Sequence, residues 1–275
     1  MRAPARVVPA VLSGFVMLAP GLSGPSLAEP AETGCRLIED ERVRVAGVID
    51  GDTLKLEDGR ILRLVTALAP KGDLPGSGRA EPALGDKATR ALAEAVEGAE
   101  LVLSFGKHPV DRHGRLLAQA FADGDPARWL QGLMVGQGLA RAYATVDNYR
   151  CVGLLLKQEA LARDAGLGLW ASGFGPIYRA DRPEDLAGEN GRFAIVEGRV
   201  LSVGERPRRT YLNFGTYWNE DFTVFVDRAD LAGFADAGLA LKGLEGRRIR
   251  VRGWIREDRG PAIRMTRPEQ LELVD

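Results

Sequence analysis

The sequence predicts a mainly β protein with some α-helix, built as a five-stranded β-barrel with three helices packed outside it, followed by a smaller antiparallel β unit. The first observation is a hairpin pattern, because apolar and polar residues alternate in 48–56 and 60–65, on either side of Asp58-Gly59. The second is a series of short alternating runs, broken by glycines, in residues 191–275. A chain of 275 residues is long enough for two such units, each with its own core.

Residues 1–28 differ in kind from the rest of the chain. Two arginines precede an apolar run from Val7 to Ala19, and Ser26-Leu27-Ala28 offers a small-residue cleavage site. This pattern predicts a bacterial secretory signal, whereas a membrane-spanning helix is disfavoured because the run is short and contains proline and glycine. We therefore expect a periplasmic or secreted product, with no transmembrane segment in the mature chain and with residues 29–42 as an N-terminal arm.

The charge of the chain excludes one class of function. Removal of residues 1–28 takes away two arginines and no acidic residue, so the formal net charge moves from −1 to −3. A nearly neutral protein does not bind polyanions through its bulk charge. Any contact with nucleic acid must then come from local clusters of basic side chains.

Cys35 and Cys151 are the two cysteines of the chain. In an oxidising compartment an isolated pair favours a disulfide, here one that ties the N-terminal arm to a distant helix and contributes roughly 3–5 kcal/mol. The alternative is a pair of buried free thiols.

The first unit is expected to span residues 43–171. Its alternating pattern runs from Val43 through the hairpin to Leu68, and residues 71–78 have the composition of a loop. Helices are expected over about 84–97, from Asp125-Pro126 to near Gly136 or Gly138, and from Asn148 to Ala165, with strands at 101–105 and 116–122. This order of elements implies a small barrel of the OB type.

The second unit is expected at residues 191–275, after a linker at 172–190 that is rich in glycine, proline and charge. It is predicted to be another OB-like barrel or an open antiparallel sheet. The strand-like segments are 193–203, 210–214, 222–226, 247–255 and 262–265.

Basic and aromatic side chains are interleaved in this second unit, notably Arg208, Arg209, Tyr211 and Trp218. Such a set suits single-stranded nucleic acid, because bases stack on aromatic rings while guanidinium groups follow the phosphates. The alternative is that the aromatic residues belong to the core and the arginines form a solvated face.

Short strings of the first unit resemble the staphylococcal nuclease (thermonuclease) family in order and spacing. They are Val48–Leu56, Arg63-Leu64, Ala69-Pro70 and Asp111-Arg-His-Gly-Arg115. The resemblance covers roughly residues 43–171 and implies calcium-dependent hydrolysis of phosphodiesters in DNA or RNA. In the family pattern, two aspartates and a backbone carbonyl hold Ca²⁺, a glutamate acts as the general base, and two arginines stabilise charge on the phosphate.

Residue by residue, the resemblance assigns Asp52 as the first metal aspartate and Arg63 and Arg115 as the phosphate arginines. The position of the second metal aspartate holds Leu68, and that of the general base holds Lys71. Leucine removes a charged ligand and lysine adds a cation that repels calcium. A lysine would also need a pKa several units below its reference value of about 10.4 to accept a proton at neutral pH.

These two substitutions leave three hypotheses. The first is an exported family member whose calcium-dependent hydrolysis is lost or impaired, but which keeps a basic pocket for a phosphate or another anion. The second is an active nuclease with substitute metal ligands, for which the candidates are Asp50, Asp73, Glu81 and Asp86. The third is a scaffold in the cell envelope or a protein that binds an envelope partner, with the second unit as the binding part.

Overall fold

The structure is a computed structural model, which describes residues 35, 40–71, 82–123, 128–145, 147–171, 177–217 and 219–274. The predicted signal segment, most of the predicted arm, the candidate ligands Asp73 and Glu81, and Trp218 lie outside these residues.

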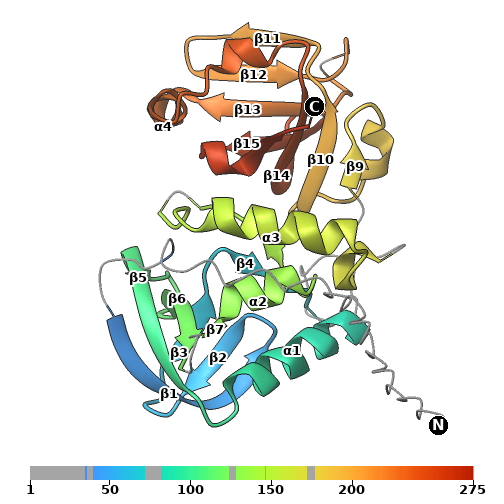
Figure 1. Cartoon of the computed structure of the whole chain (residues 1–275). Helices are drawn as coiled ribbons and strands as arrows, with labels where there is room; N and C mark the ends of the chain where they lie inside the picture. The colour runs from blue at the N-terminus through green and yellow to red at the C-terminus, as the bar shows by residue number, and fades with distance from the viewer. Residues whose placement is uncertain are drawn as a thin grey trace, which may run out of the picture.

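A closed five-stranded barrel forms the first unit (Figure 1). The strands follow the order β3-β2-β1-β5-β6, and a parallel pairing of β3 with β6 closes the barrel. The predicted hairpin is present, with β2 antiparallel to β3 and Gly59 at a φ of +87° in the turn between them. The strands are β1 (Asp40–Asp50), β2 (Thr53–Leu56), β3 (Ile61–Leu64), β5 (Glu100–Val110) and β6 (Leu116–Ala122).

Three helices accompany the barrel: α1 (Pro82–Val96), α2 (Leu130–Gly136) and α3 (Val152–Asp164). The apolar residues of α1 at helical spacing, Leu84, Ala88, Leu92 and Val96, are all buried. The predicted fold class, mainly β with helices around a five-stranded barrel, is thus confirmed. This unit also contains the short strand β4 (Ala67–Leu68), which pairs with β8 (Arg141–Ala142), and the 3-10 turn η1 (Gly168–Trp170).

Two helices begin later than the sequence suggests. Before α2, Arg128 and Trp129 form the short strand β7 and pair with β6, while Asp125-Pro126 lies outside the described residues. Asn148 does not cap α3, because that helix begins at Val152 with Cys151 at its N-cap. The strand pairing of Trp129 and the disulfide of Cys151 lie at the two observed boundaries.

The second unit is a β sheet in the order β11-β12-β13-β15-β14-β10-β9, with β16 paired to β14. The pairing of β13 with β15 is parallel, so the sheet is not purely antiparallel. Its elements are β9 (Ile177–Arg179), η2 (Pro183–Leu186), β10 (Phe193–Arg199), β11 (Ser202–Glu205), β12 (Arg209–Asn213), β13 (Thr223–Asp227), η3 (Arg228–Asp230), α4 (Leu231–Asp236), η4 (Leu241–Leu244), β14 (Arg248–Glu257), β15 (Pro261–Met265), η5 (Pro268–Gln270) and β16 (Leu271–Leu273).

Part of the expected linker belongs to this second sheet. β9 pairs in parallel with β10, and Ala180 and Leu186 are buried in the core of the second unit. The chain from residue 177 onward therefore folds as part of the second unit.

Helix α3 lies between the barrel and the second sheet (Figure 1). Arg252 on β14 reaches across to Glu159 on α3, and the ring of Phe193 on β10 meets that of Tyr143 edge-on, with ring centres 6.4 Å apart. The two units are thus joined by a charged pair and an aromatic contact.

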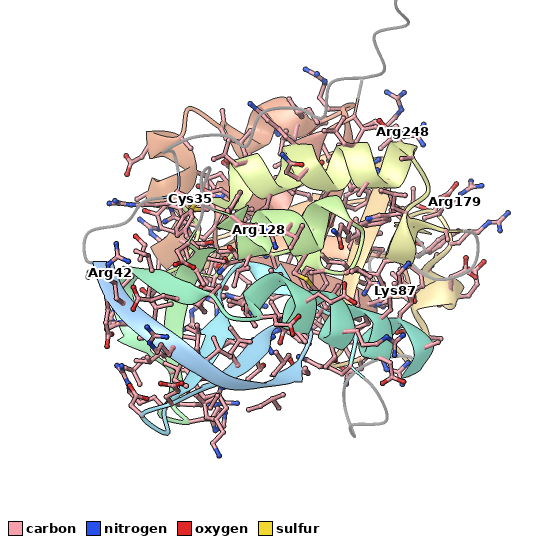
Figure 2. All side chains as sticks on the ribbon, turned by 60° about the horizontal axis from the view of Figure 1, so that its bottom comes forward. Cys35, Arg42, Lys87, Arg128, Arg179 and Arg248 are labelled. Atoms are coloured by element: carbon pink, nitrogen blue, oxygen red, sulfur yellow. A yellow bond between two sulfur atoms is a disulfide. The ribbon has the colours of Figure 1, made fainter. Side chains whose placement is uncertain are left out.

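Cys35, which is labelled in Figure 2, forms a disulfide with Cys151, and their Cα atoms lie 5.1 Å apart. It links residue 35 to the N-cap of α3 across 116 positions of sequence. Among the described residues, no helix has the length and apolar character that crossing a membrane requires.

Candidate functional site

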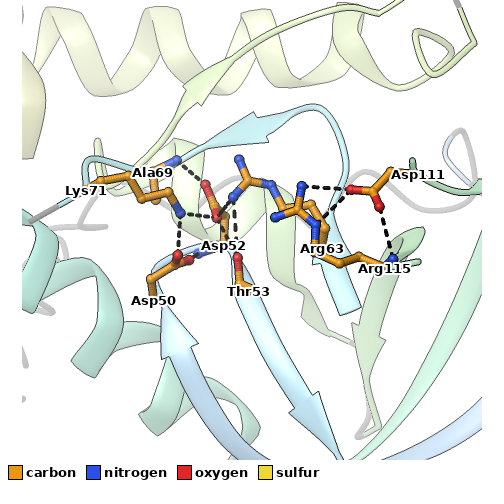
Figure 3. A network of polar contacts seen from close by, with 8 residues as sticks. All are labelled: Asp50, Asp52, Thr53, Arg63, Ala69, Lys71, Asp111 and Arg115. Atoms are coloured by element: carbon orange, nitrogen blue, oxygen red, sulfur yellow. Dashed lines mark hydrogen bonds and ion pairs between the residues drawn. The ribbon is translucent and has the colours of Figure 1, made fainter. Parts of the chain in front are cut away.

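The candidate site lies where β1 ends and β2 begins (Figure 3). Asp50 is the last residue of β1, and Asp52 lies in the turn that leads to β2. Arg63 on β3 is brought there because Thr53 pairs with Arg63 in the antiparallel register of β2 and β3. The antiparallel strands β1, β2 and β3 thus bring together three charged side chains that the sequence singled out.

Asp52 is the centre of the site and is fully buried. Its Oδ1 accepts hydrogen bonds from Arg63, from Lys71 and, at 3.1 Å, from Thr53. Its Oδ2 accepts one from the backbone N–H of Ala69 at 2.8 Å. Both oxygens of this carboxylate are therefore engaged by protein donors.

Lys71 bridges the two aspartates of the site. Its Nζ lies 2.7 Å from Asp50 Oδ2 and also contacts Asp52 Oδ1. Asp50 in turn accepts a hydrogen bond of 3.0 Å from the backbone N–H of Asp52. The lysine ammonium therefore lies between two carboxylates, as Figure 3 shows.

The two aspartates differ in their affinity for a proton. Burial raises the pKa of Asp52 to about 6, against the opposing charges of Arg63 and Lys71. Burial also raises the pKa of Asp50, but its hydrogen bond with Asp52 and the charge of Lys71 outweigh this effect and lower the pKa to about 2. The pair behaves as two coupled carboxylates, of which the more exposed one ionises first.

Arg115 is held by Asp111 at the start of β6. Its Nε and Nη2 each lie 2.7 Å from Asp111 Oδ2, and its backbone N–H donates to Asp111 Oδ1 at 3.0 Å. Burial raises the pKa of Asp111, but the hydrogen bonds from Arg115 and from the backbone of His113 keep the pKa below its usual value. The Asp111-to-Arg115 motif therefore builds a turn that orients the second arginine.

Tyr143 is a residue of the site that the sequence did not single out. Its side chain is hydrogen-bonded to Arg63 and lies within the electrostatic influence of Arg115. Burial raises the pKa of its hydroxyl, and Arg63 partly offsets that effect. Tyr143 arrives here because β8 pairs with β4 and its own N–H donates to Thr66 O at 3.0 Å. In the sequence it is one of five tyrosines with no motif to distinguish it.

The charges of the site are balanced, which differs from the basic pocket expected from the sequence. Arg63 and Lys71 contact Asp52, Lys71 also contacts Asp50, and Arg115 contacts Asp111. Three cations thus meet three carboxylates. Arg115 is the most accessible of the three cations, with 35% of its side chain exposed.

The described residues do not fit calcium, which prefers several oxygen ligands with charged carboxylates among them. Leu68 has no side-chain oxygen that could bind a metal, and Lys71 places a cation between Asp50 and Asp52. Asp86, a candidate substitute, is exposed on α1. Within the described ranges, no group of three or more His, Cys, Asp or Glu residues has a metal-binding arrangement.

The predicted nucleic-acid residues lie in the second unit and are mostly engaged within it. Arg209 lies 2.8 Å from Asp227 and stacks over the ring of Phe225 at 4.2 Å. Tyr211 packs against the same ring, at 6.4 Å between ring centres, while Arg208 is exposed. The structure therefore does not bring these residues to the Asp52 site.

Residues 61–172 match the family described as staphylococcal nuclease homologue. The match contains Arg63, Leu68, Lys71 and Arg115, and it begins after Asp50 and Asp52. No curated protein sequence matches the chain.

Proposed function

Because residues 61–172 form a staphylococcal nuclease homologue domain, we propose that this protein is an exported member of the family in which the usual calcium-dependent phosphodiester hydrolysis is lost or impaired. The observation that carries the proposal is the position of the Lys71 ammonium, which contacts both Asp50 and Asp52. Export is supported by the signal-like pattern of residues 1–28 and by the disulfide between Cys35 and Cys151.

The lysine ammonium opposes a metal at the aspartates for an electrostatic reason. A divalent ion about 4 Å from a single positive charge is repelled by about 8 kcal/mol at an effective dielectric constant of about 20. Calcium would therefore have to displace Lys71 from both carboxylates. With Leu68 in place of a ligand, the described residues hold too few charged oxygens to offset that displacement.

The activation of water is impaired for a second reason. Lys71 stands at the position of the general base, but it donates to two carboxylates instead of accepting a proton. The carboxylate of Asp52 is also engaged on both oxygens. No described group in the aspartate cluster is both free and placed to accept a proton from water.

The part that remains suited to a ligand is the pair of arginines with Tyr143. A phosphate needs hydrogen-bond donors with positive charge, which a guanidinium supplies in a planar fork. Arg115 is partly exposed and oriented by Asp111. We expect this edge of the site to bind a phosphate-bearing ligand, including the phosphates of single-stranded nucleic acid, without a metal.

The first test is hydrolysis of single-stranded DNA and RNA by the mature protein, with and without calcium, beside an Arg63→Ala, Arg115→Ala variant. The expected result is no calcium-dependent cleavage by the folded wild-type protein. Calcium-dependent cleavage that disappears in the double variant would overturn the proposal and favour an active nuclease with substitute ligands.

The second test restores the missing groups with Leu68→Asp and Lys71→Glu. We expect calcium binding, measured by calorimetry, and hydrolysis to rise together. The control is Leu68→Asp with Lys87→Glu, which changes the net charge by the same amount at an exposed position of α1. An equal gain in the control would show that overall charge, and not the position of Lys71, is responsible.

A further inference from the structure

A cavity of about 480 Å³ lies at the junction of the two units. Phe105 and Lys107 of β5 line it from the barrel, and Tyr149 and Arg150 line it from the segment before α3. Arg267 reaches it from the second unit. Asp50, Asp52 and Arg63 do not line it, so the cavity differs from the nuclease-like site. Its volume is within the range of small-molecule sites, which often lie at domain junctions.

Positive charge predominates around this cavity. Lys107 and Arg150 are exposed, whereas Arg267 stacks on the ring of Tyr149 at 3.5 Å and is paired with Glu269, also at 3.5 Å. Asp147 is the one acidic residue in the described lining, and it already lies 3.2 Å from His108. The lining therefore favours an anion.

The N-terminus of α3 lies at the wall of this cavity. Cys151 lines the cavity and is the N-cap of this 13-residue helix. In the described structure no side chain caps the helix, and its first turn carries no acidic residue. Uncapped N–H groups and the positive end of the helix dipole favour a phosphate or carboxylate.

The inner wall carries buried polar groups. The Nε2 of Gln119 donates to Thr66 Oγ1 at 2.9 Å, and Trp129 Nε1 donates to Gln119 Oε1 at 2.9 Å. Thr66, a β-branched residue, has a φ of +65°, a conformation that costs backbone energy and is often found at functional sites. The network holds Thr66 and Gln119 in fixed positions on the wall.

Asn148 supplies an unsatisfied group in the same lining. Its side-chain Oδ1 has no hydrogen-bond partner among the described residues, although Asn148 is only 7% exposed. A buried polar atom without a partner is costly unless a ligand or water satisfies it. The cavity lining thus includes buried hydrogen-bonding groups as well as basic side chains.

We propose that this cavity binds a small phosphorylated ligand with a ring, of the mononucleotide class. The phosphate binds at the N-terminus of α3 with Arg150 and Lys107. The ring lies against Phe105 and Tyr149, and a donor on it satisfies Asn148. The proposal does not depend on the loss of calcium-dependent hydrolysis, because it uses a different set of residues.

The test is calorimetric titration of the mature full chain with two probes, adenosine 5′-monophosphate and inorganic phosphate. We expect the nucleotide to bind at least tenfold more tightly than phosphate. Lys107→Gln with Arg150→Gln should weaken nucleotide binding by at least tenfold, and both side chains are exposed, so the fold should be retained. Lys87→Gln, an exposed change on α1, should leave binding unchanged.

Three results would overturn the proposal. One is the absence of nucleotide binding to the wild-type protein. Another is equal affinity for inorganic phosphate, which would remove the role of the ring. The third is binding that is lost in Arg115→Ala but kept in the Lys107→Gln, Arg150→Gln variant, which would place the nucleotide at the Asp52 site instead. Retained binding in Arg115→Ala supports the junction cavity whether or not the protein hydrolyses nucleic acid.

Discussion

Arg252 of the second unit lies 2.7 Å from Glu159 of α3, and neither side chain is exposed. The same guanidinium donates to Ala142 O at 2.9 Å, and Glu159 Oε1 accepts from Ala142 N–H at 2.8 Å. Both backbone groups of Ala142 are thus held by this pair. Because Tyr143 is the next residue, the second unit supports the position of a tyrosine that contacts Arg63.

The Arg252–Glu159 pair leads to a prediction about stability. Arg252→Ala leaves the buried Glu159 with only the more distant Arg163, at 3.8 Å, so we expect a loss of about 3 kcal/mol in the free energy of unfolding. Arg248→Ala, on the same strand but with 59% of its side chain exposed, should cost less than about 1 kcal/mol. Urea unfolding of both variants measures the difference, and equal losses would contradict a special role for the buried pair.

The raised pKa of Asp52 predicts how stability depends on pH. A folded-state pKa of about 6, above the reference value of 3.8, means that the folded protein holds a proton that the unfolded chain has released. Its contribution to stability is full below pH 4 and is lost as the pH rises through about 6. A shift of this size corresponds to up to about 3 kcal/mol.

The measurement is urea unfolding between pH 4 and 7 for the wild type and Asp52→Asn. The stability of the wild type relative to this variant should fall as the pH rises across that window. Asp58→Asn is the control, because the pKa of Asp58 is already lowered and its contribution should stay constant there. Asp50, with a pKa of about 2, acts in the opposite direction and only below about pH 4. A flat difference for Asp52→Asn would contradict the raised pKa.

The Cys35–Cys151 bond predicts a second effect on stability. It closes a long loop, because the two cysteines are separated by 116 in sequence number. In the loop-entropy account a closure of this length contributes about 4–5 kcal/mol by restricting the unfolded chain. We expect the Cys35→Ser, Cys151→Ser variant to unfold at a lower temperature than the wild type without reductant. The two proteins should unfold alike once the wild type is reduced, and a difference that survives reduction would argue against the disulfide as its cause.

Gly138 and Gly166 both have a positive φ, but we expect their substitution by alanine to cost different amounts of stability. A Cβ on Gly138 would lie 2.1 Å from the backbone oxygen of Leu167, whereas a Cβ on Gly166 meets nothing within 4 Å. Gly166→Ala should therefore cost only the conformational strain, about 1 kcal/mol. Gly138→Ala must also separate two backbone segments and should cost at least about 2 kcal/mol more. Thermal unfolding compares them, and similar midpoints would show that the segments move apart easily.

Local chemistry in the sequence made much of the barrel predictable. Asp58-Gly59 between alternating runs was enough for the hairpin, and the strand predicted at 116–122 matches β6. The boundaries of α2 and α3 were less predictable. Trp129 pairs with β6, and Asn148 is buried, so contacts from distant parts of the chain override the local capping signals.

Some residues of the candidate site were predictable from local motifs, and others were not. Asp52, Arg63 and Arg115 lie within the short family-like motifs, and Lys71 directly follows one of them, Ala69-Pro70. Tyr143 enters the site through the pairing of β8 with β4, which no local pattern indicates. The balance of charge at the site also depends on contacts between residues far apart in sequence. Lys71 is 19 residues from Asp52 in the sequence but contacts it in the fold.

The sequence by itself determined the two β units and the resemblance to a nuclease family, and it predicted that Leu68 and Lys71 stand at two key positions of that family. These follow from hydrophobic periodicity, turn residues and short motifs, which are local properties of the chain. The tertiary structure alone decided that the Lys71 ammonium lies between Asp50 and Asp52, and that Arg252 joins the second unit to α3. Such contacts depend on the packing of segments far apart in sequence, where burial strengthens charge interactions that a linear pattern does not specify.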